Sequence, residues 1–333
     1  MTRRLDRKLA RIRQGRYTPG DFIIADAKDG DMAFGCATPG AEIAADGTPT
    51  GRFRPITDYR ADIVKVTESD LTDIMLMSLS TAEMMQDQSL FRDSEVTPAV
   101  RLNDTTDIWL ARGGAYGRSP ARPFRTARLD RVRDVTDLGL YAVTFYNDPD
   151  RDWQTLEAYR AFREEASANH VRHFLEIFNP AFAVATADAE FASYNNDMIV
   201  RCLAGVSRQD RPIFLKATYN GPRATEEIAS YDPENIIFGI LGGGAGTTRD
   251  CLELISQAEK YGARVALFGR KIYHSEDSVL MVRAIRRVIE EPIGSTEATR
   301  AYHADLVAAG ITPHRPIEAD LELTDPVLRE YAE

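Results

Sequence analysis

A lysine inside an apolar segment is the residue of this sequence whose setting most clearly suggests chemistry. Lys216 lies in PIFLKATYNG, and only six of the 41 basic residues of the chain are lysines. The alternation of an extended strand places Phe214, Lys216 and Thr218 on one face. Burial near the end of such a strand lowers the pKa of an amine, and a neutral amine can attack a ketone. The iminium that forms accepts electrons when an adjacent C–C bond breaks or forms.

The alternative for Lys216 is a structural ion pair. Glu176 lies in the preceding apolar segment, HFLEIF, where the alternation also points it inward. A lysine and a glutamate on neighbouring strands could simply neutralise each other, although lysines are rarely buried without a role. The residue pattern alone leaves both interpretations open.

Two glycine-rich turns suggest an anion site. The segment 239–250 (GILGGGAGTTRD) contains Gly242, Gly243 and Gly244 and leads into a helix expected from about 247, whose N-terminal dipole favours anions. The segment 267–273 (LFGRKIY) contains Gly269 and Arg270. A glycine-rich loop by itself indicates only a tight turn, but two of them with an arginine predict a phosphate site.

Further candidates for proton transfer follow other apolar segments. Asp26 lies in IIADAKDGD, where Asp29 and Asp31 are better explained as a solvated loop, and Tyr146 lies in TFYND. A carboxylate or a tyrosine hydroxyl at a strand end can move a proton. We therefore expect Lys216, Tyr146, Asp26 and Glu176 to form the catalytic group. The alternative for Tyr146 is a ring packed at the rim of the fold.

The sequence gives little support for a metal or cofactor site. The five histidines (His170, His173, His274, His303 and His314) form no recognisable ligand set, and the three cysteines show no CxxC spacing. We therefore expect no metal and no cofactor other than the covalent imine on Lys216.

The elements that must position these residues alternate between short strands and amphipathic helices, as in a parallel sheet with crossover helices. Eight strands close a (β/α)8 TIM barrel. We expect one α/β domain over residues 1–333, with an N-terminal helix, a barrel core at about 20–292 and a C-terminal extension at 293–333 that begins with a helix. The expected strands are 21–26, 73–78, 96–101, 139–146, 172–178, 211–217, 236–241 and 264–268.

Two long segments should lie over the catalytic face of this barrel. Residues 28–53 are glycine-rich and follow the first strand, which predicts a mobile loop. Residues 104–137 follow the third strand and are rich in Arg and Gly, which predicts an insertion that serves as a lid or as a subunit contact.

Composition restricts the class of protein. The chain is 44% hydrophobic and 28% charged, and no apolar run is long enough to span a membrane. The net charge of −10 argues against general nucleic-acid binding. We expect a cytoplasmic enzyme that acts on a small molecule, without a membrane or nucleic-acid partner.

The ordered segments IIADAKDGD, AVTFYND, IFLKATYNG, ILGGGAG and VALFGRKIYHSEDSVLMVRAIRRVI resemble the class I aldolases of the DeoC/FbaB/LacD superfamily. The likeness is to archaeal-type fructose-bisphosphate aldolases and to a related thiolase of quorum-signal breakdown. It implies a Schiff-base aldolase of carbohydrate metabolism that acts on a phosphorylated ketose or keto acid and assembles as a homo-oligomer. The implied residues are Lys216 for the imine, Asp26, Tyr146 for proton transfer, and Gly243, Gly244, Gly269 and Arg270 around a phosphate.

The sequence departs from this pattern at two places. Many relatives have Asp-His after the first strand, whereas here Ala27 and Lys28 follow Asp26, and the arginine-rich insertion is unfamiliar. Alternatives therefore remain. The imine could serve a thiolase, a decarboxylase or an isomerase acting on a sugar phosphate, or the barrel could bind a sugar phosphate without catalysis.

Overall fold

Eight parallel strands form a closed barrel in the computed structural model, which describes residues 3–44, 48–103, 110–115, 117–187, 190–242 and 246–331. Neighbouring strands follow the chain order around the barrel, and β1 pairs with both β4 and β10. The barrel strands are β1 (Ile23–Lys28), β4 (Ile74–Met77), β5 (Thr97–Arg101), β6 (Leu138–Thr144), β7 (Arg172–Phe178), β8 (Leu215–Ala217), β9 (Gly239–Leu241) and β10 (Val265–Phe268). All eight coincide with expected strands, so the predicted (β/α)8 barrel is confirmed.

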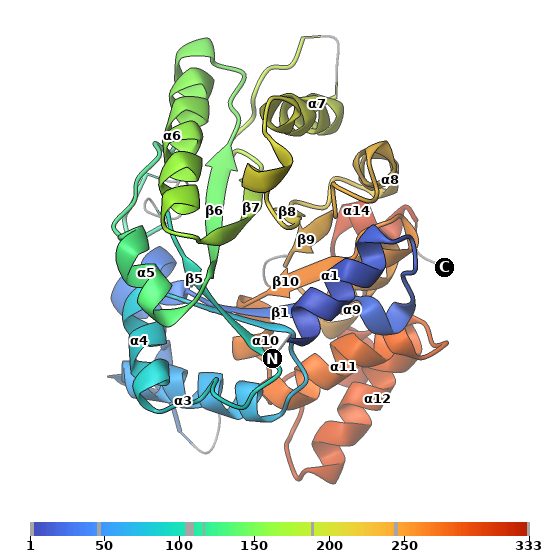
Figure 1. Ribbon diagram of the computed structural model, residues 1–333. Helices are drawn as coiled ribbons and strands as arrows, with labels where there is room; N and C mark the ends of the chain where they lie inside the picture. The colour runs from blue at the N-terminus through green and yellow to red at the C-terminus, as the bar shows by residue number, and fades with distance from the viewer. Residues whose placement is uncertain are drawn as a thin grey trace.

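Helices follow the strands and surround the barrel (Figure 1). Those that follow barrel strands are α3 (Ile56–Glu68), α4 (Leu79–Asp87), α5 (Leu129–Val135), α6 (Pro149–Ala168), α7 (Phe191–Ala204), α8 (Pro222–Tyr231), α9 (Thr248–Lys260), α10 (Arg270–Tyr273) and α11 (Ser278–Glu290). The N-terminal helix is α1 (Arg4–Arg13), and the C-terminal extension contains α12 (Ser295–Ala308), α13 (Ile317–Asp320) and α14 (Pro326–Arg329).

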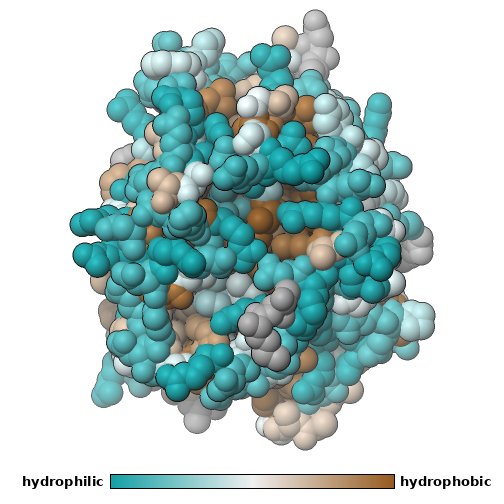
Figure 2. Space-filling model, viewed as in Figure 1, coloured by the Kyte–Doolittle hydropathy of each residue, from teal (hydrophilic) through white to brown (hydrophobic). Residues whose placement is uncertain are grey.

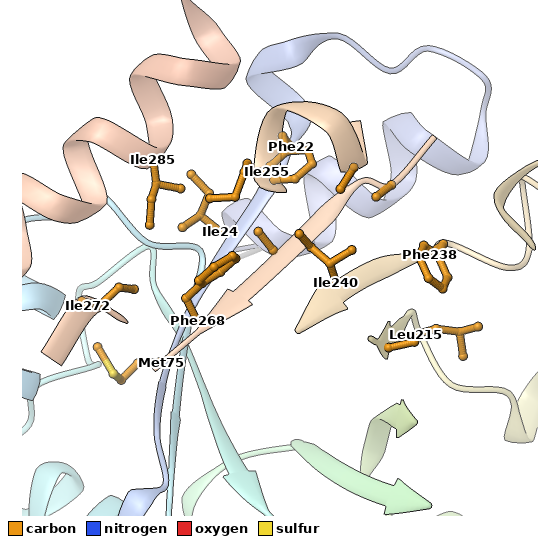
Figure 3. Packing of buried hydrophobic residues seen from close by; sticks show 14 of the residues in the cluster. Phe22, Ile24, Met75, Leu215, Phe238, Ile240, Ile255, Phe268, Ile272 and Ile285 are labelled. Carbon is orange, nitrogen blue, oxygen red and sulfur yellow. The ribbon is translucent and has the colours of Figure 1, made fainter. Parts of the chain in front are cut away.

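The apolar side chains form two layers because successive residues of a strand face opposite sides. One layer lies between the strands and the helices; Figure 3 shows Ile24, Ile240 and Phe268 of the strands packed with Ile255 of α9 and Ile285 of α11. The other layer fills the barrel and is closed by Leu5, Leu9 and Ile12 of α1. This amphipathic helix therefore covers the end of the barrel where the strands begin, opposite the end where a TIM barrel builds its active site.

The segment expected as a mobile loop after the first strand contains regular structure. Within 28–53 lie α2 (Gly30–Phe34) and an antiparallel hairpin of β2 (Ala41–Ile43) and β3 (Pro49–Phe53). All five residues of β3 are exposed, so no buried face produces the hydrophobic alternation by which a strand is recognised.

The insertion expected at 104–137 is described only in part. Residues 110–115 and 117–137 are described, and α5 occupies Leu129–Val135. Leu110 lines a cavity at the end of the barrel where the strands end, so this part of the insertion reaches the face at which a TIM barrel builds its active site.

The surface seen in Figure 2 is mostly hydrophilic, and hydrophobic residues show chiefly in recesses between the polar ones. Across the described ranges, no helix is both long and apolar enough to cross a membrane.

Candidate active site

A cavity of about 140 Å³ opens where the barrel strands end. Lys216 and Glu176 lie in its lining, together with Gly242, Gly269 and Arg270. These are five of the nine residues that the sequence selected. Gly243 and Gly244 lie outside the described residues, and neither Asp26 nor Tyr146 lines the cavity.

Strand alternation turns Lys216 into the barrel, as the sequence predicts. Phe214 packs in the interior layer, whereas Leu215 and Ala217 pack in the layer beneath the helices. The register of β7 on β8 pairs Glu176 with Lys216, which brings the two side chains side by side. The carboxylate contacts the ammonium directly, and both side chains are almost completely buried.

Two further charged residues extend this pair across the barrel. Arg101, at the end of β5, lies 3.3 Å from the second carboxylate oxygen of Glu176 and 2.8 Å from Oδ2 of Asp29. The order Asp29, Arg101, Glu176, Lys216 alternates in charge, so two anions balance two cations in a buried environment. Such balance is needed because an uncompensated charge inside a protein is costly.

Arg101 is not among the residues predicted from the sequence, and Asp29 was expected in a solvated loop. In the structure Asp29 precedes α2 and is buried, and both residues line the cavity. A signal was present for Arg101: TPAVR ends a fully buried strand in a charged residue, and a strand end faces the catalytic side of a barrel.

Asp26 lies behind the cavity wall. In β1, Ile23 and Ala25 fill the barrel, so Asp26 faces the surrounding helices with Ile24. Its Oδ2 lies 2.6 Å from Nζ of Lys28, which is also 3.1 Å from Asp62 of α3. Complete burial raises the pKa of Asp26 to about 6, and Lys28 opposes that shift.

The Asp26–Lys28–Asp62 cluster supports the aromatic wall of the cavity. Nζ of Lys28 lies 5.6 Å from the ring centroid of Tyr273, and Tyr273 packs edge to face against Tyr59 at 4.6 Å. Both tyrosines line the cavity, so the cluster lies behind the cavity wall and supports the tyrosines that form it.

Tyr146 follows β6 and is buried with its hydroxyl engaged. The hydroxyl oxygen accepts a hydrogen bond of 2.9 Å from the backbone N–H of Ala121, and the ring stacks on Phe182. Burial raises the pKa of Tyr146. In this arrangement the residue holds the insertion against the barrel.

The two glycine-rich turns meet the cavity at the ends of β9 and β10. A Cβ on Gly269 would lie 2.3 Å from the carbonyl oxygen of Ala27, so glycine is required for this approach to β1. Arg270 begins α10 beside the cavity, with its guanidinium 5.7 Å from the ring centroid of Phe34.

The N-terminus of α9 differs from the expectation that its dipole would favour a phosphate. The N–H of Thr248 donates to Oδ1 of Asp320 at 2.7 Å, and Asp250 forms a capping box with Thr247. Carboxylates of the protein therefore already satisfy this helix end. The groups at the cavity that remain available to bind an anion are the turn glycines and Arg270.

Among the described residues, no three His, Cys, Asp or Glu side chains are grouped so that they could hold a metal ion. The cavity offers instead a lysine amine, two carboxylates and arginines. This set suits proton transfer and the binding of an anionic carbonyl compound.

No protein-family model matches the chain. Among curated proteins, the 3-hydroxy-5-phosphonooxypentane-2,4-dione thiolase of Salmonella paratyphi A is 36% identical over 93 residues, which cover 28% of this chain and 30% of the thiolase. The thiolase of the same name from Salmonella typhimurium is 36% identical over 85 residues, 26% of this chain and 28% of the thiolase. Each match therefore spans less than a third of the relative.

Solved structures share the fold over most of the chain. An archaeal fructose 1,6-bisphosphate aldolase has a TM-score of 0.60 at 13% identity, covering 86% of this chain and 98% of its own. A Schiff-base-forming fructose-1,6-bisphosphate aldolase has a TM-score of 0.60 at 15% identity, covering 86% and 99%. The fructose-bisphosphate aldolase of Slackia heliotrinireducens has a TM-score of 0.62 at 12% identity, covering 91% and 90%. The chain therefore has the barrel fold that the resemblance implied, that of the fructose-bisphosphate aldolases.

Proposed function

We propose that this protein is a class I aldolase that forms a Schiff base through Lys216 with a phosphorylated ketose or keto acid. The observation that carries the proposal is the buried contact between the amine of Lys216 and the carboxylate of Glu176 in the lining of the cavity. The fold of Schiff-base-forming aldolases supports the same chemistry by analogy.

Glu176 can serve two stages of such a reaction. Lys216 must lose a proton before it attacks the substrate carbonyl, and the adjacent carboxylate can accept that proton. The resulting iminium is a cation, so the same carboxylate stabilises it once it returns to the ionised form. Arg101 contacts the other oxygen of Glu176 and keeps the carboxylate oriented toward the lysine.

A second acid–base group is needed at the substrate hydroxyl from which C–C cleavage proceeds. We assign this role to Asp29, whose carboxylate lies in the cavity lining and is held by Arg101. Tyr146, implied by the resemblance, does not line the cavity, and its hydroxyl oxygen accepts the N–H of Ala121. Asp26 has a positioning role in this proposal because it acts through Lys28 and the aromatic wall.

The substrate phosphate is proposed to bind between the turns at Gly242 and Gly269, beside Arg270. Backbone N–H groups of such turns and a guanidinium are suitable donors for phosphate oxygens. Because Lys216 lies in the same lining, one substrate could bring its phosphate to the turns and its carbonyl to the amine.

A second imine reaction, thiolysis, is favoured by the partial sequence match to the Salmonella thiolases. It would use the same lysine and phosphate site but transfer an acyl group to a thiol. Product analysis with and without an added thiol separates the two reactions.

The proposal is tested by borohydride reduction in the presence of dihydroxyacetone phosphate and a panel of other ketose and keto-acid phosphates, followed by peptide mass spectrometry. We expect a reduced adduct on Lys216 with at least one compound and none in Lys216→Met. Lys65→Gln, which removes a surface lysine paired with Asp277, is the matched control and should keep the adduct. Absence of an adduct on Lys216 with every compound, while circular dichroism shows an intact fold, would overturn the proposal.

A further inference from the structure

A second, larger cavity lies at the opposite end of the barrel. Its volume is about 830 Å³, within the range of roughly 300–1,000 Å³ common for small-molecule sites. The first residues of β7, the turn before β6 and the segment that leads into β8 contribute to its lining, with the C-terminal part of α6. It therefore shares no lining residue with the cavity around Lys216.

Arginine dominates the charge of this second cavity. Six arginines line it, against three acidic side chains, although the whole chain carries a net charge of −10. The arginines are Arg13, Arg133, Arg163, Arg172, Arg208 and Arg211, and the acids are Asp137, Asp210 and Glu234. A local excess of positive charge on an acidic protein attracts anions to that place.

The pairing of these arginines shows which ones are available. Arg172 lies 2.7 Å from Asp6 and 3.0 Å from Asp137, so its charge is compensated. Arg211 donates to the carbonyl of Val206 and lies 3.9 Å from Asp232. Partners within the protein thus already compensate the charges of Arg172 and Arg211.

Three other guanidinium groups have no such partner. Within the described ranges, Arg133 of α5, Arg163 of α6 and Arg208 of the short 3-10 helix η4 (Arg208–Asp210) make no hydrogen bond or ion pair. The guanidinium of Arg163 lies over the face of Tyr159, 5.1 Å from the ring centroid, and its Nε is buried without a hydrogen-bond partner.

Arginines near helix C-termini can be explained by the helix dipole, because the last carbonyls attract cations. Arg133 lies in the last turn of α5. Neither Arg133 nor Arg163 nor Arg208, however, bonds to a carbonyl of the described chain. Arg13 donates to the carbonyl of Ile213 at 3.1 Å, and its pKa is lowered by desolvation first and by the neighbouring Arg172 second. Among the described residues, backbone carbonyls therefore compensate Arg13 and Arg211 in part, but not the charges of Arg133, Arg163 and Arg208.

We propose that this second cavity is a binding site for a small polyanion that carries two or more phosphate or carboxylate groups. Arg133, Arg163 and Arg208 come from three different elements around one cavity, which suits several anionic groups on one molecule better than a single charge. Guanidinium groups bind both phosphate and carboxylate through paired N–H donors. The proposal is independent of the reaction at Lys216.

Isothermal titration calorimetry at low ionic strength tests the proposal, with pyrophosphate and citrate as the phosphate and carboxylate probes. The variant Arg133→Gln/Arg208→Gln removes two exposed, unpartnered arginines of the cavity. Arg283→Gln/Arg300→Gln is the matched control, because it removes the same charge from exposed arginines of α11 and α12 outside the cavity lining. Lys216→Met tests independence from the catalytic cavity.

We expect the wild type, the control and Lys216→Met to bind at least one probe with equal affinity. We expect the Arg133/Arg208 variant to bind it at least tenfold more weakly, since one charge-assisted hydrogen bond contributes about a factor of ten. The thermal midpoint should rise with the probe in the first three proteins only. Three results would each overturn the proposal: no binding of either probe to the wild type at millimolar concentration, equal weakening in both arginine variants, or loss of binding in Lys216→Met.

Discussion

The carboxylate of Glu176 neutralises two cations inside the barrel, so removing it alone should cost more than removing it together with Lys216. In the order Asp29, Arg101, Glu176, Lys216 the charges are balanced. Glu176→Gln leaves two cations and one anion in a buried site, where Glu176 is only 1% exposed. The double variant Glu176→Gln/Lys216→Met leaves Asp29 with Arg101, which is balanced again.

Removing one partner of a buried ion pair typically costs about 3–5 kcal/mol, whereas replacing both partners by uncharged groups is often neutral. We expect the loss in free energy of unfolding for Glu176→Gln to lie near the lower limit, at about 3 kcal/mol, because the amide oxygen still faces the cations. An unfolding entropy of about 2.1 cal/mol/K per residue over 333 residues converts this loss into a fall in Tm of roughly 4 °C.

The assay is guanidinium denaturation followed by far-UV circular dichroism on the wild type, both single variants and the double variant. We expect a coupling energy of about 2–3 kcal/mol between Glu176 and Lys216. The control cycle uses Arg160 and Glu164, a surface pair at 2.6 Å on α6, for which about 0.5 kcal/mol or less is expected. Additivity of the Glu176 and Lys216 losses to within about 0.5 kcal/mol would refute the electrostatic argument.

Two further predictions concern Asp26, Asp29 and Tyr146. Because the pKa of Asp26 is raised to about 6 in the folded state, the native protein retains a proton that the unfolded chain releases near pH 4. The free energy of unfolding of the wild type, relative to that of Asp26→Asn, should therefore fall by on the order of 3 kcal/mol between pH 4 and 6. A difference that does not change with pH in denaturation experiments would contradict this. Steady-state kinetics would use the compound that gives an adduct on Lys216 in the borohydride experiment. Asp29→Asn should lower kcat by about 10²–10⁴-fold, whereas Tyr146→Phe should lower kcat less than tenfold. The reverse order would assign proton transfer to Tyr146.

The match between expected and observed strands shows how much of the fold is local information. Strand alternation in IFLKA identified Lys216 as inward-facing, and the same alternation in HFLEIF identified Glu176. Alternation depends only on the residues of one strand, so it is readable before the sheet is known. The hairpin within 28–53 was missed because its exposed residues produce no such pattern.

The candidate site required tertiary information for its other members. Asp26 and Asp29 lie in one short segment, and only the closed barrel determines that Ala25 and Ala27 face inward, which leaves Asp26 behind the wall and Asp29 in the cavity. Arg101 became part of the site because, in the closed barrel, β5 lies two strands away from β7, which carries Glu176, and two strands away from β1, which leads to Asp29.

The sequence by itself determined the eight-stranded barrel and the inward lysine on β8, because hydrophobic periodicity and the number of strands are properties of the linear chain. The tertiary structure decided which charges meet. The register of β7 on β8 placed Glu176 beside Lys216, and barrel closure joined Asp29 and Arg101 to them. It also gathered arginines from α1, α5, α6, the start of β7 and the segment before β8 around a second cavity. Contacts between residues far apart in the chain depend on register and closure, which no local pattern specifies.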